Sequence, residues 1–192
     1  MKFAILIMAA GLSQRFKQAN SGHKLLALLQ GKPVLQHTLE QALASEMDVY
    51  VVSRPEDRDI HLLASRAHLI KVASAGLGHS IAAGVAATSQ YDGWLIVLAD
   101  MPLVTTASYL AVGRALKTSP LVRSEVNGIP GHPVAFQKPF YADLIQLEGD
   151  NGARALLSTH PVMPVKLTDQ GCLQDVDTPA MLSLLAQRLS EG

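Results

Sequence analysis

The chain has 192 residues, and 48% of them are hydrophobic, which is enough for one sizeable core and too little for two complete domains. Sixteen Lys and Arg residues balance sixteen Asp and Glu residues, so we expect no general attraction to nucleic acid or anionic membranes, and any anionic ligand needs a local site. The single cysteine, Cys172, excludes an internal disulfide, and no apolar run reaches the roughly 20 residues that span a bilayer. Both observations favour a cytoplasmic protein.

Short apolar runs alternate with segments of helical periodicity, a pattern typical of βα units around a mostly parallel sheet. In the first part of the chain we expect strands at 3–8, 49–52 and 95–98, and helices at 33–44, 55–65, 80–87 and 108–116. After Pro120 we expect strands at 121–126, 134–136 and 162–167, and helices at 139–147, 152–157 and 178–189. Two prolines and two glycines predict a loop at 127–133. The fold class is therefore α/β in a single domain.

The first candidate site follows the first strand, in the segment Ala9-Ala10-Gly11-Leu12-Ser13. Small residues at a strand exit leave main-chain amides open to phosphates, while Arg15 and Lys24 supply positive charge nearby. An ordinary tight turn between strand and helix accounts for the same pattern. Neither the dinucleotide-binding fingerprint nor the P-loop motif occurs in the chain.

The second candidate site consists of carboxylates that follow predicted strands or precede a helix. Asp100 comes directly after the strand at 95–98, where ligands of open α/β sheets collect, so it can hold Mg²⁺ against phosphate oxygens. Asp175 and Asp177 precede the last predicted helix and can supply a second ligand. Helix or turn capping is the alternative for Asp100 and Asp177.

Seven ordered motifs resemble the small nucleotidyltransferases of molybdenum cofactor maturation, above all the molybdopterin cytidylyltransferases. They extend over nearly the whole chain and comprise AAGLSQRF at 9–16, KLL at 24–26, GLGHS at 76–80, LADMP at 98–102, NGIPGHP at 127–133, GDNGAR at 149–154 and DVDTP at 175–179. The resemblance implies a three-layer α/β/α Rossmann-like nucleotidyltransferase fold. Residues 1–118 would then form the nucleotide-binding half of the single domain 1–192, and residues 119–192 the substrate-binding half.

The same resemblance assigns roles to individual residues. Arg15, Lys24 and Asp100 would be catalytic, and Asp100 and Asp177 would hold Mg²⁺. The residues implied in nucleotide binding are Ala9, Ala10, Gly11, Leu12, Ser13, Arg15, Lys24, Gly76 and Ser80, and those implied in substrate binding are Pro130, Gly131, His132, Pro133, Asp150, Asn151 and Arg154. Alanine at position 10, where guanylyl-transferring relatives carry glycine, implies CTP rather than GTP.

The implied reaction transfers CMP from CTP to the terminal phosphate of molybdopterin, with release of pyrophosphate and with a molybdoenzyme or its chaperone as a transient partner. Two alternatives remain: transfer from GTP or to another acceptor such as a sugar phosphate, and a non-catalytic protein that binds and delivers nucleotide or cofactor. One departure from the family concerns Lys17, which stands where glycine usually follows Arg15-Phe16, and the stretch to Lys24 is longer than usual. Lys17 could therefore take over the role of Lys24.

Overall fold

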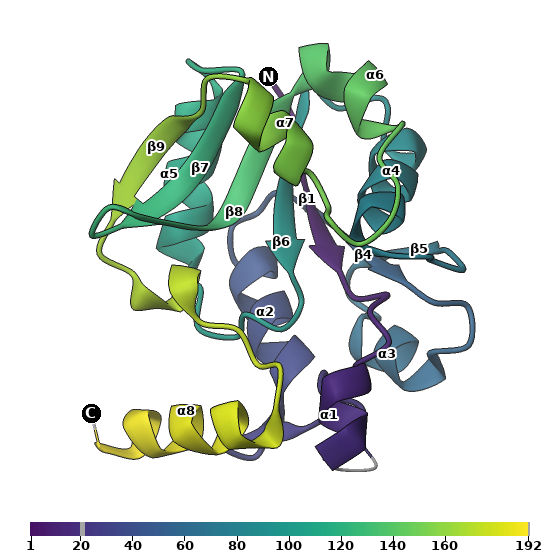
Figure 1. Ribbon diagram of the computed structural model, residues 1–192, viewed down its shortest axis with the longest axis vertical. Helices are drawn as coiled ribbons and strands as arrows, with labels where there is room; N and C mark the ends of the chain where they lie inside the picture. The colour runs from purple at the N-terminus through teal and green to yellow at the C-terminus, as the bar shows by residue number, and fades with distance from the viewer. Residues whose placement is uncertain (20–21, 192) are drawn as a thin grey trace.

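A seven-stranded sheet forms the middle layer of the computed structural model, which describes residues 1–19 and 22–191 without the side chains of Arg15, Ala19 and Glu191. The strand order is β5-β4-β1-β6-β8-β7-β9, and only β8 runs antiparallel to its neighbours (Figure 1). The strands are β1 (Phe3–Met8), β4 (Asp48–Ser53), β5 (His68–Lys71), β6 (Gly93–Leu98), β7 (Leu121–Val126), β8 (Ile129–Gln137) and β9 (Met163–Leu167). The predicted α/β class and mostly parallel sheet are confirmed.

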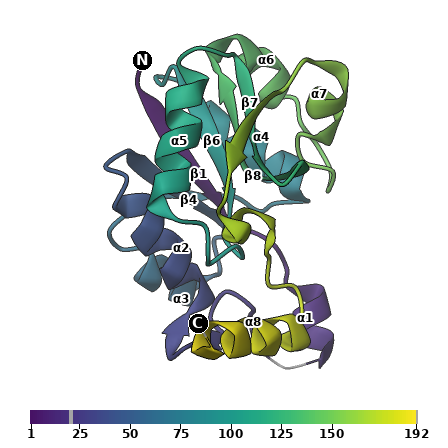
Figure 2. The same ribbon diagram turned by 90° about the vertical axis from the view of Figure 1, so that its left-hand side faces the viewer.

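Helices cover both faces of this sheet, so the molecule has three layers (Figure 2). Alternate residues of β1 face opposite sides: Ile5 and Ile7 pack in one core, and Ala4 and Leu6 in the other. The first core is closed by α2 (Val34–Leu43), α3 (Arg58–Leu63), α5 (Thr106–Leu116) and α8 (Pro179–Glu191). The second is closed by α4 (Leu77–Ala87), α6 (Tyr141–Leu144) and α7 (Arg154–Thr159).

Several short elements were not predicted from the sequence. They are α1 (Gln14–Ala19), the strands β2 (Leu28–Leu29) and β3 (Lys32–Pro33), the edge strand β5, and the 3-10 turns η1 (Lys138–Phe140) and η2 (Gln170–Leu173). The helix expected at 55–65 is shorter, since α3 is confined to Arg58–Leu63. No helix within residues 1–19 and 22–191 has the length and apolar character needed to cross a bilayer.

The loop expected at 127–133 is wrong, because β8 already begins at Ile129. Asn127 and Gly128, both with positive φ, form a tight turn from β7 into β8. Pro130 and Pro133 fit in the strand because the pairing of β8 with β6 stops at Val134 and Ile96, and the β7–β8 register shifts between Arg123 and Glu125. A strand segment with few ladder bonds tolerates proline, which has no N–H to donate.

Candidate active site

A cleft of about 680 Å³ lies at the carboxyl ends of β1, β4 and β6. Segments that are far apart in the sequence meet here, at the sheet edge where open parallel sheets bind ligands. Eleven of the sequence-derived site residues line it: Ala9, Ala10, Gly11, Leu12, Ser13, Lys24, Gly76, Ser80, Asp100, Asp150 and Asp177. The structure therefore brings together most of the expected nucleotide and metal residues.

The segment from Ala9 to Ser13 leaves the sheet between its two neighbouring strands. The Ala9 amide donates to the Val52 carbonyl at 2.8 Å, so the segment is fixed at its start. Ser13 has a positive φ of 54°, and its buried hydroxyl has no hydrogen-bond partner among the described residues. A Cβ built at Gly11 meets nothing within 4 Å. The backbone is thus open to the cleft, as expected for a segment that receives a ligand.

Lys24 reaches the cleft from a turn that the core holds in place. The next residue, Leu25, is buried, and its carbonyl accepts a hydrogen bond from the Leu35 amide at 3.0 Å. The Lys24 Nζ donates to Asp100 Oδ2 at 2.6 Å and to Asp177 Oδ1 at 2.7 Å. One ammonium group therefore joins two carboxylates that are 77 positions apart in the chain.

A backbone hydrogen bond brings the two carboxylates together. The amide of Val176, a fully buried residue, donates to the carbonyl of Asp100 at 2.9 Å. At the start of α8, Thr178 Oγ1 accepts a hydrogen bond from the Met181 amide at 3.2 Å. The shared Lys24 and this backbone bond place Asp100 and Asp177 at the same point of the cleft.

The charges of this group are strongly coupled. Burial by itself lowers the pKa of Lys24, but Asp100 and Asp177 outweigh that effect and the net pKa is raised. Burial raises the pKa of Asp100, although the charge of Lys24 opposes this rise. The lysine therefore remains an ammonium ion and compensates the charge of Asp100 and Asp177.

The same carboxylates fit a divalent cation. Oxygens of Asp100, Asp175 and Asp177 lie within 4.8 Å of one another. The Asp100 Oδ1 atom is buried and has no hydrogen-bond partner among the described residues, so it is available as a ligand. Carboxylate oxygens are the ligands that Mg²⁺ and Mn²⁺ prefer. The residues present suit such an ion.

The side of the cleft formed by residues 74–80 depends on close backbone contacts. A Cβ at Gly76 would come within 2.4 Å of the Gly149 carbonyl oxygen, and the Gly78 amide donates to that same oxygen at 2.8 Å. Ser80 is buried, and its hydroxyl lies 2.6 Å from that of Ser74. Ser80 therefore stabilises this turn. The segment at 149–150 packs directly against it.

Sequence reasoning missed Arg54, which also lines the cleft. Its Nη1 donates to the carbonyls of Ser74 at 2.8 Å and Ala10 at 3.4 Å, so it connects the two segments described above. Arg54 is the first residue after β4, and Asp100 is the second residue after β6. The rule that ligands collect at strand ends could have identified it.

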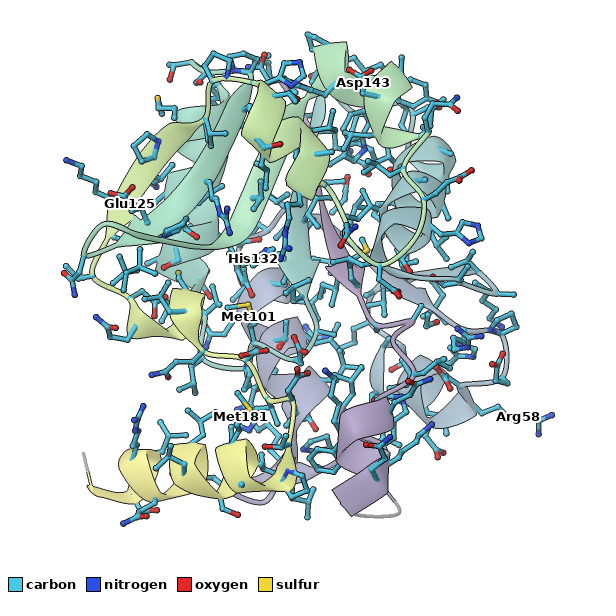
Figure 3. All side chains as sticks on the ribbon, in the orientation of Figure 1. Arg58, Met101, Glu125, His132, Asp143 and Met181 are labelled. Carbon is cyan, nitrogen blue, oxygen red and sulfur yellow. The ribbon has the colours of Figure 1, made fainter. Side chains whose placement is uncertain are left out.

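Six of the expected substrate-binding residues do not line the cleft: Pro130, Gly131, His132, Pro133, Asn151 and Arg154. The first four belong to β8, and Arg154 is the first residue of α7. In Figure 3 the labelled His132 lies in the middle of the molecule, above Met101. His132 is not in a loop, and its Nδ1 is buried and unpartnered among the described residues. The side chain of Arg15 and the stretch at 20–21 lie outside the described residues, so the roles expected there stay predictions.

Comparison with known proteins agrees with this arrangement. The family model described as MobA-like NTP transferase domain matches residues 5–164. The molybdenum cofactor cytidylyltransferase of Escherichia coli K12 is 25% identical over 191 residues, which cover 97% of this chain and 96% of that protein. The bifunctional protein GlmU of Paramagnetospirillum magneticum is 32% identical over 110 residues, or 56% of this chain, and the match spans only 24% of GlmU.

Solved structures share the fold. Rv0371c of Mycobacterium tuberculosis H37Rv, crystallised with manganese, has a TM-score of 0.81 at 20% identity, covering 97% of this chain and 99% of that one. Molybdopterin-guanine dinucleotide biosynthesis protein A of Archaeoglobus fulgidus has a TM-score of 0.74 at 17% identity, covering 98% and 100%. At these identities the likeness concerns the architecture alone.

Proposed function

Since the chain belongs to the MobA-like NTP transferase family and is thus a nucleotidyltransferase, we propose that its reaction transfers CMP from CTP to the terminal phosphate of molybdopterin. The full-length likeness to a molybdenum cofactor cytidylyltransferase supports this choice of substrates. The observation that carries the proposal is the meeting of Lys24, Asp100 and Asp177 beside the open segment at 9–13. We further propose that residues 1–118 bind the nucleotide and residues 119–192 the acceptor.

The chemistry is a displacement at the α-phosphorus of CTP. An oxygen of the acceptor phosphate forms a bond to that phosphorus while the bond to the bridging oxygen breaks, and pyrophosphate leaves with the electron pair. The acceptor is already anionic, so the protein needs to align the two phosphates and neutralise charge rather than supply a strong base.

In this proposal the residues of the cleft have separate roles. Asp100 and Asp177, with Asp175 beside them, would hold Mg²⁺, which would supply positive charge to stabilise the leaving pyrophosphate. Lys24 leaves the carboxylates and pairs with phosphate oxygens. The open backbone at Gly11 lets the triphosphate approach the main-chain amides.

A pyrophosphate-release assay tests the proposal. Each of the four NTPs is supplied with Mg²⁺, with and without molybdopterin, and CTP-specific release that depends on molybdopterin is the expected result. Preference for GTP, or release that depends on a sugar phosphate instead, would contradict the proposed substrates. Tight nucleotide binding without release under any of these conditions would instead indicate a delivery protein.

A further inference from the structure

Asp150 is a charged residue of the cleft that the steps proposed above do not use. It belongs to the loop between α6 and α7, in the second half of the chain. A Cβ built at Gly76 would come within 2.5 Å of Asp150 Oδ1, so the carboxylate lies directly against the backbone of the turn at 74–80. The loop thus places an acid on the wall of the cleft from which α4 begins.

Backbone contacts hold this loop in place and leave the Asp150 side chain free. Gly149 has a positive φ of 65°, and its carbonyl accepts from the Gly78 amide at 2.8 Å. A Cβ at Gly78 would come within 2.5 Å of the Glu148 carbonyl oxygen. Within residues 1–19 and 22–191 the Asp150 carboxylate has neither a hydrogen bond nor an ion pair. Both of its oxygens are therefore available to accept hydrogen bonds from a ligand.

The charge of Asp150 determines which part of a nucleotide it can contact. A carboxylate repels phosphate and needs a hydrogen-bond donor instead. In CTP the donors are the two ribose hydroxyls and the exocyclic amine of cytosine. Asp150 therefore suits the nucleoside part of the substrate rather than its triphosphate.

The position of Asp150 in the fold favours the amine over the ribose. Asp100 lies beyond β6 and Arg54 beyond β4, and β1 separates these two strands in the sheet. Neighbouring strands lie about 4.8 Å apart, so the two strand ends are about 10 Å apart. Arg54 Nη1 donates to the Ser74 carbonyl at 2.8 Å, in the same turn that Asp150 contacts. The ribose adjoins the α-phosphate, and the amine lies on the far edge of the base. A nucleotide whose α-phosphate lies near Asp100 therefore brings its amine toward Asp150.

We propose that Asp150 accepts a hydrogen bond from the exocyclic amine of cytosine and thereby makes the protein prefer CTP to UTP. The proposal deepens the proposed function and rests on it. Uracil carries a carbonyl oxygen where cytosine carries the amine, so with UTP two acceptors meet without a proton between them, which is unfavourable. Asp150 then contacts the nucleotide although it lies outside residues 1–118, as Asp177 does through the metal.

The test measures binding of CTP and of UTP by calorimetry in the presence of Mg²⁺, with no acceptor present. The wild type binds CTP about tenfold or more tightly than UTP, and in Asp150→Asn the two affinities come within about threefold of each other. The reason is that an amide can accept from the cytosine amine or donate to the uracil carbonyl. The ratio is the readout, because loss of the negative charge by itself strengthens the binding of both nucleotides.

Asp143→Asn is the matched control. Asp143 is exposed on α6 and does not line the cleft, and Figure 3 shows it at the far end of the molecule from α8, so its variant keeps the wild-type ratio. An unchanged ratio in folded Asp150→Asn overturns the proposal, including the case in which both affinities change equally, as contact with the ribose would produce. If Asp150→Asn does not fold, Asp150→Ala removes the acceptor and also lowers the ratio.

Failure of the proposed function gives a different result from failure of this site. A wild type that prefers GTP to CTP contradicts the proposed substrate, and Asp150 is then tested with GTP and ITP, since the base of ITP lacks the exocyclic amine. Asp150→Ala reduces the preference for GTP over ITP if Asp150 binds the amine, and an unchanged preference overturns the proposal. Where GTP is not preferred, equal affinity of the wild type for CTP and UTP also overturns it.

Discussion

Replacing Lys24 by Met should tighten binding of a divalent ion while it abolishes turnover. In the nucleotide-free protein the Lys24 ammonium lies 2.6 Å from Asp100 Oδ2 and 2.7 Å from Asp177 Oδ1, so it binds the same oxygens that a metal needs. Each charge-assisted hydrogen bond contributes about 1.5–3 kcal/mol, so an incoming ion displaces roughly 3–6 kcal/mol of interaction. The displaced ammonium group recovers part of this interaction free energy through hydration.

If about half of the lower figure remains as a net cost, Lys24→Met binds the ion about tenfold more tightly, because 1.4 kcal/mol corresponds to a factor of ten. Mn²⁺ is a suitable probe, and the free ion is measured by electron paramagnetic resonance in a titration at pH 8 without nucleotide. Turnover with CTP falls by about a hundredfold or more, since a cation beside the phosphates is lost.

The matched control is Lys32→Met, which also removes an ion-paired lysine. Lys32 pairs with Glu40 at 2.5 Å on the surface and does not line the cleft, so its Mn²⁺ affinity should equal that of the wild type. Mn²⁺ affinity in a folded Lys24→Met protein that is equal to or weaker than the wild type would refute the reasoning. Lys24 and the metal would then not compete for the same carboxylates.

Other changes give separate tests. Asp100→Asn should lower kcat by about a hundredfold or more and weaken Mn²⁺ binding, with a circular dichroism melt showing a folded protein; near-normal turnover would remove Asp100 from the metal site. Gly11→Ala should leave Tm within about 2 °C, because its Cβ meets nothing within 4 Å, yet lower kcat/KM for CTP, and an unaffected kcat/KM would place the triphosphate elsewhere. Burial raises the pKa of Cys172 to about 11, so a thiol reagent at pH 8 should label it only as fast as the protein unfolds. Burial lowers the pKa of His132 from 6.5 to about 4 in the folded protein, so below pH 6.5 the unfolded chain binds a proton that the folded protein does not. The free energy of unfolding should therefore fall between pH 6.5 and 4 by about 1–3 kcal/mol more than in His132→Asn. Denaturant titrations at each pH would measure this difference.

Local patterns predicted the central strands well. β1, β4 and β6 are short apolar runs because they are buried on both faces, so composition alone marks them. Edge strand β5 was missed because it is largely exposed and pairs only with β4, which leaves no apolar pattern. The polar six-residue α1 was missed for a similar reason.

The functional site was likewise predicted from the sequence only in part. Asp100 was found because a carboxylate directly after a buried strand is a local signal, whereas the partnership of Lys24 with Asp100 and Asp177 depends on tertiary contacts. Arg54 gave the same strand-end signal as Asp100 but was not singled out.

In the proposed function, the reversed direction of β8 keeps the binding of the acceptor apart from the binding of the nucleotide. In a wholly parallel sheet every segment at the ligand edge follows a strand, so nucleotide and acceptor would compete for the same few exits. β8 enters the sheet from that edge, and in the proposed function residues 129–133 contact the acceptor there. On that proposal, substitutions at 129–133 would alter the choice of acceptor without disturbing the segment at 9–13, which we propose binds the triphosphate.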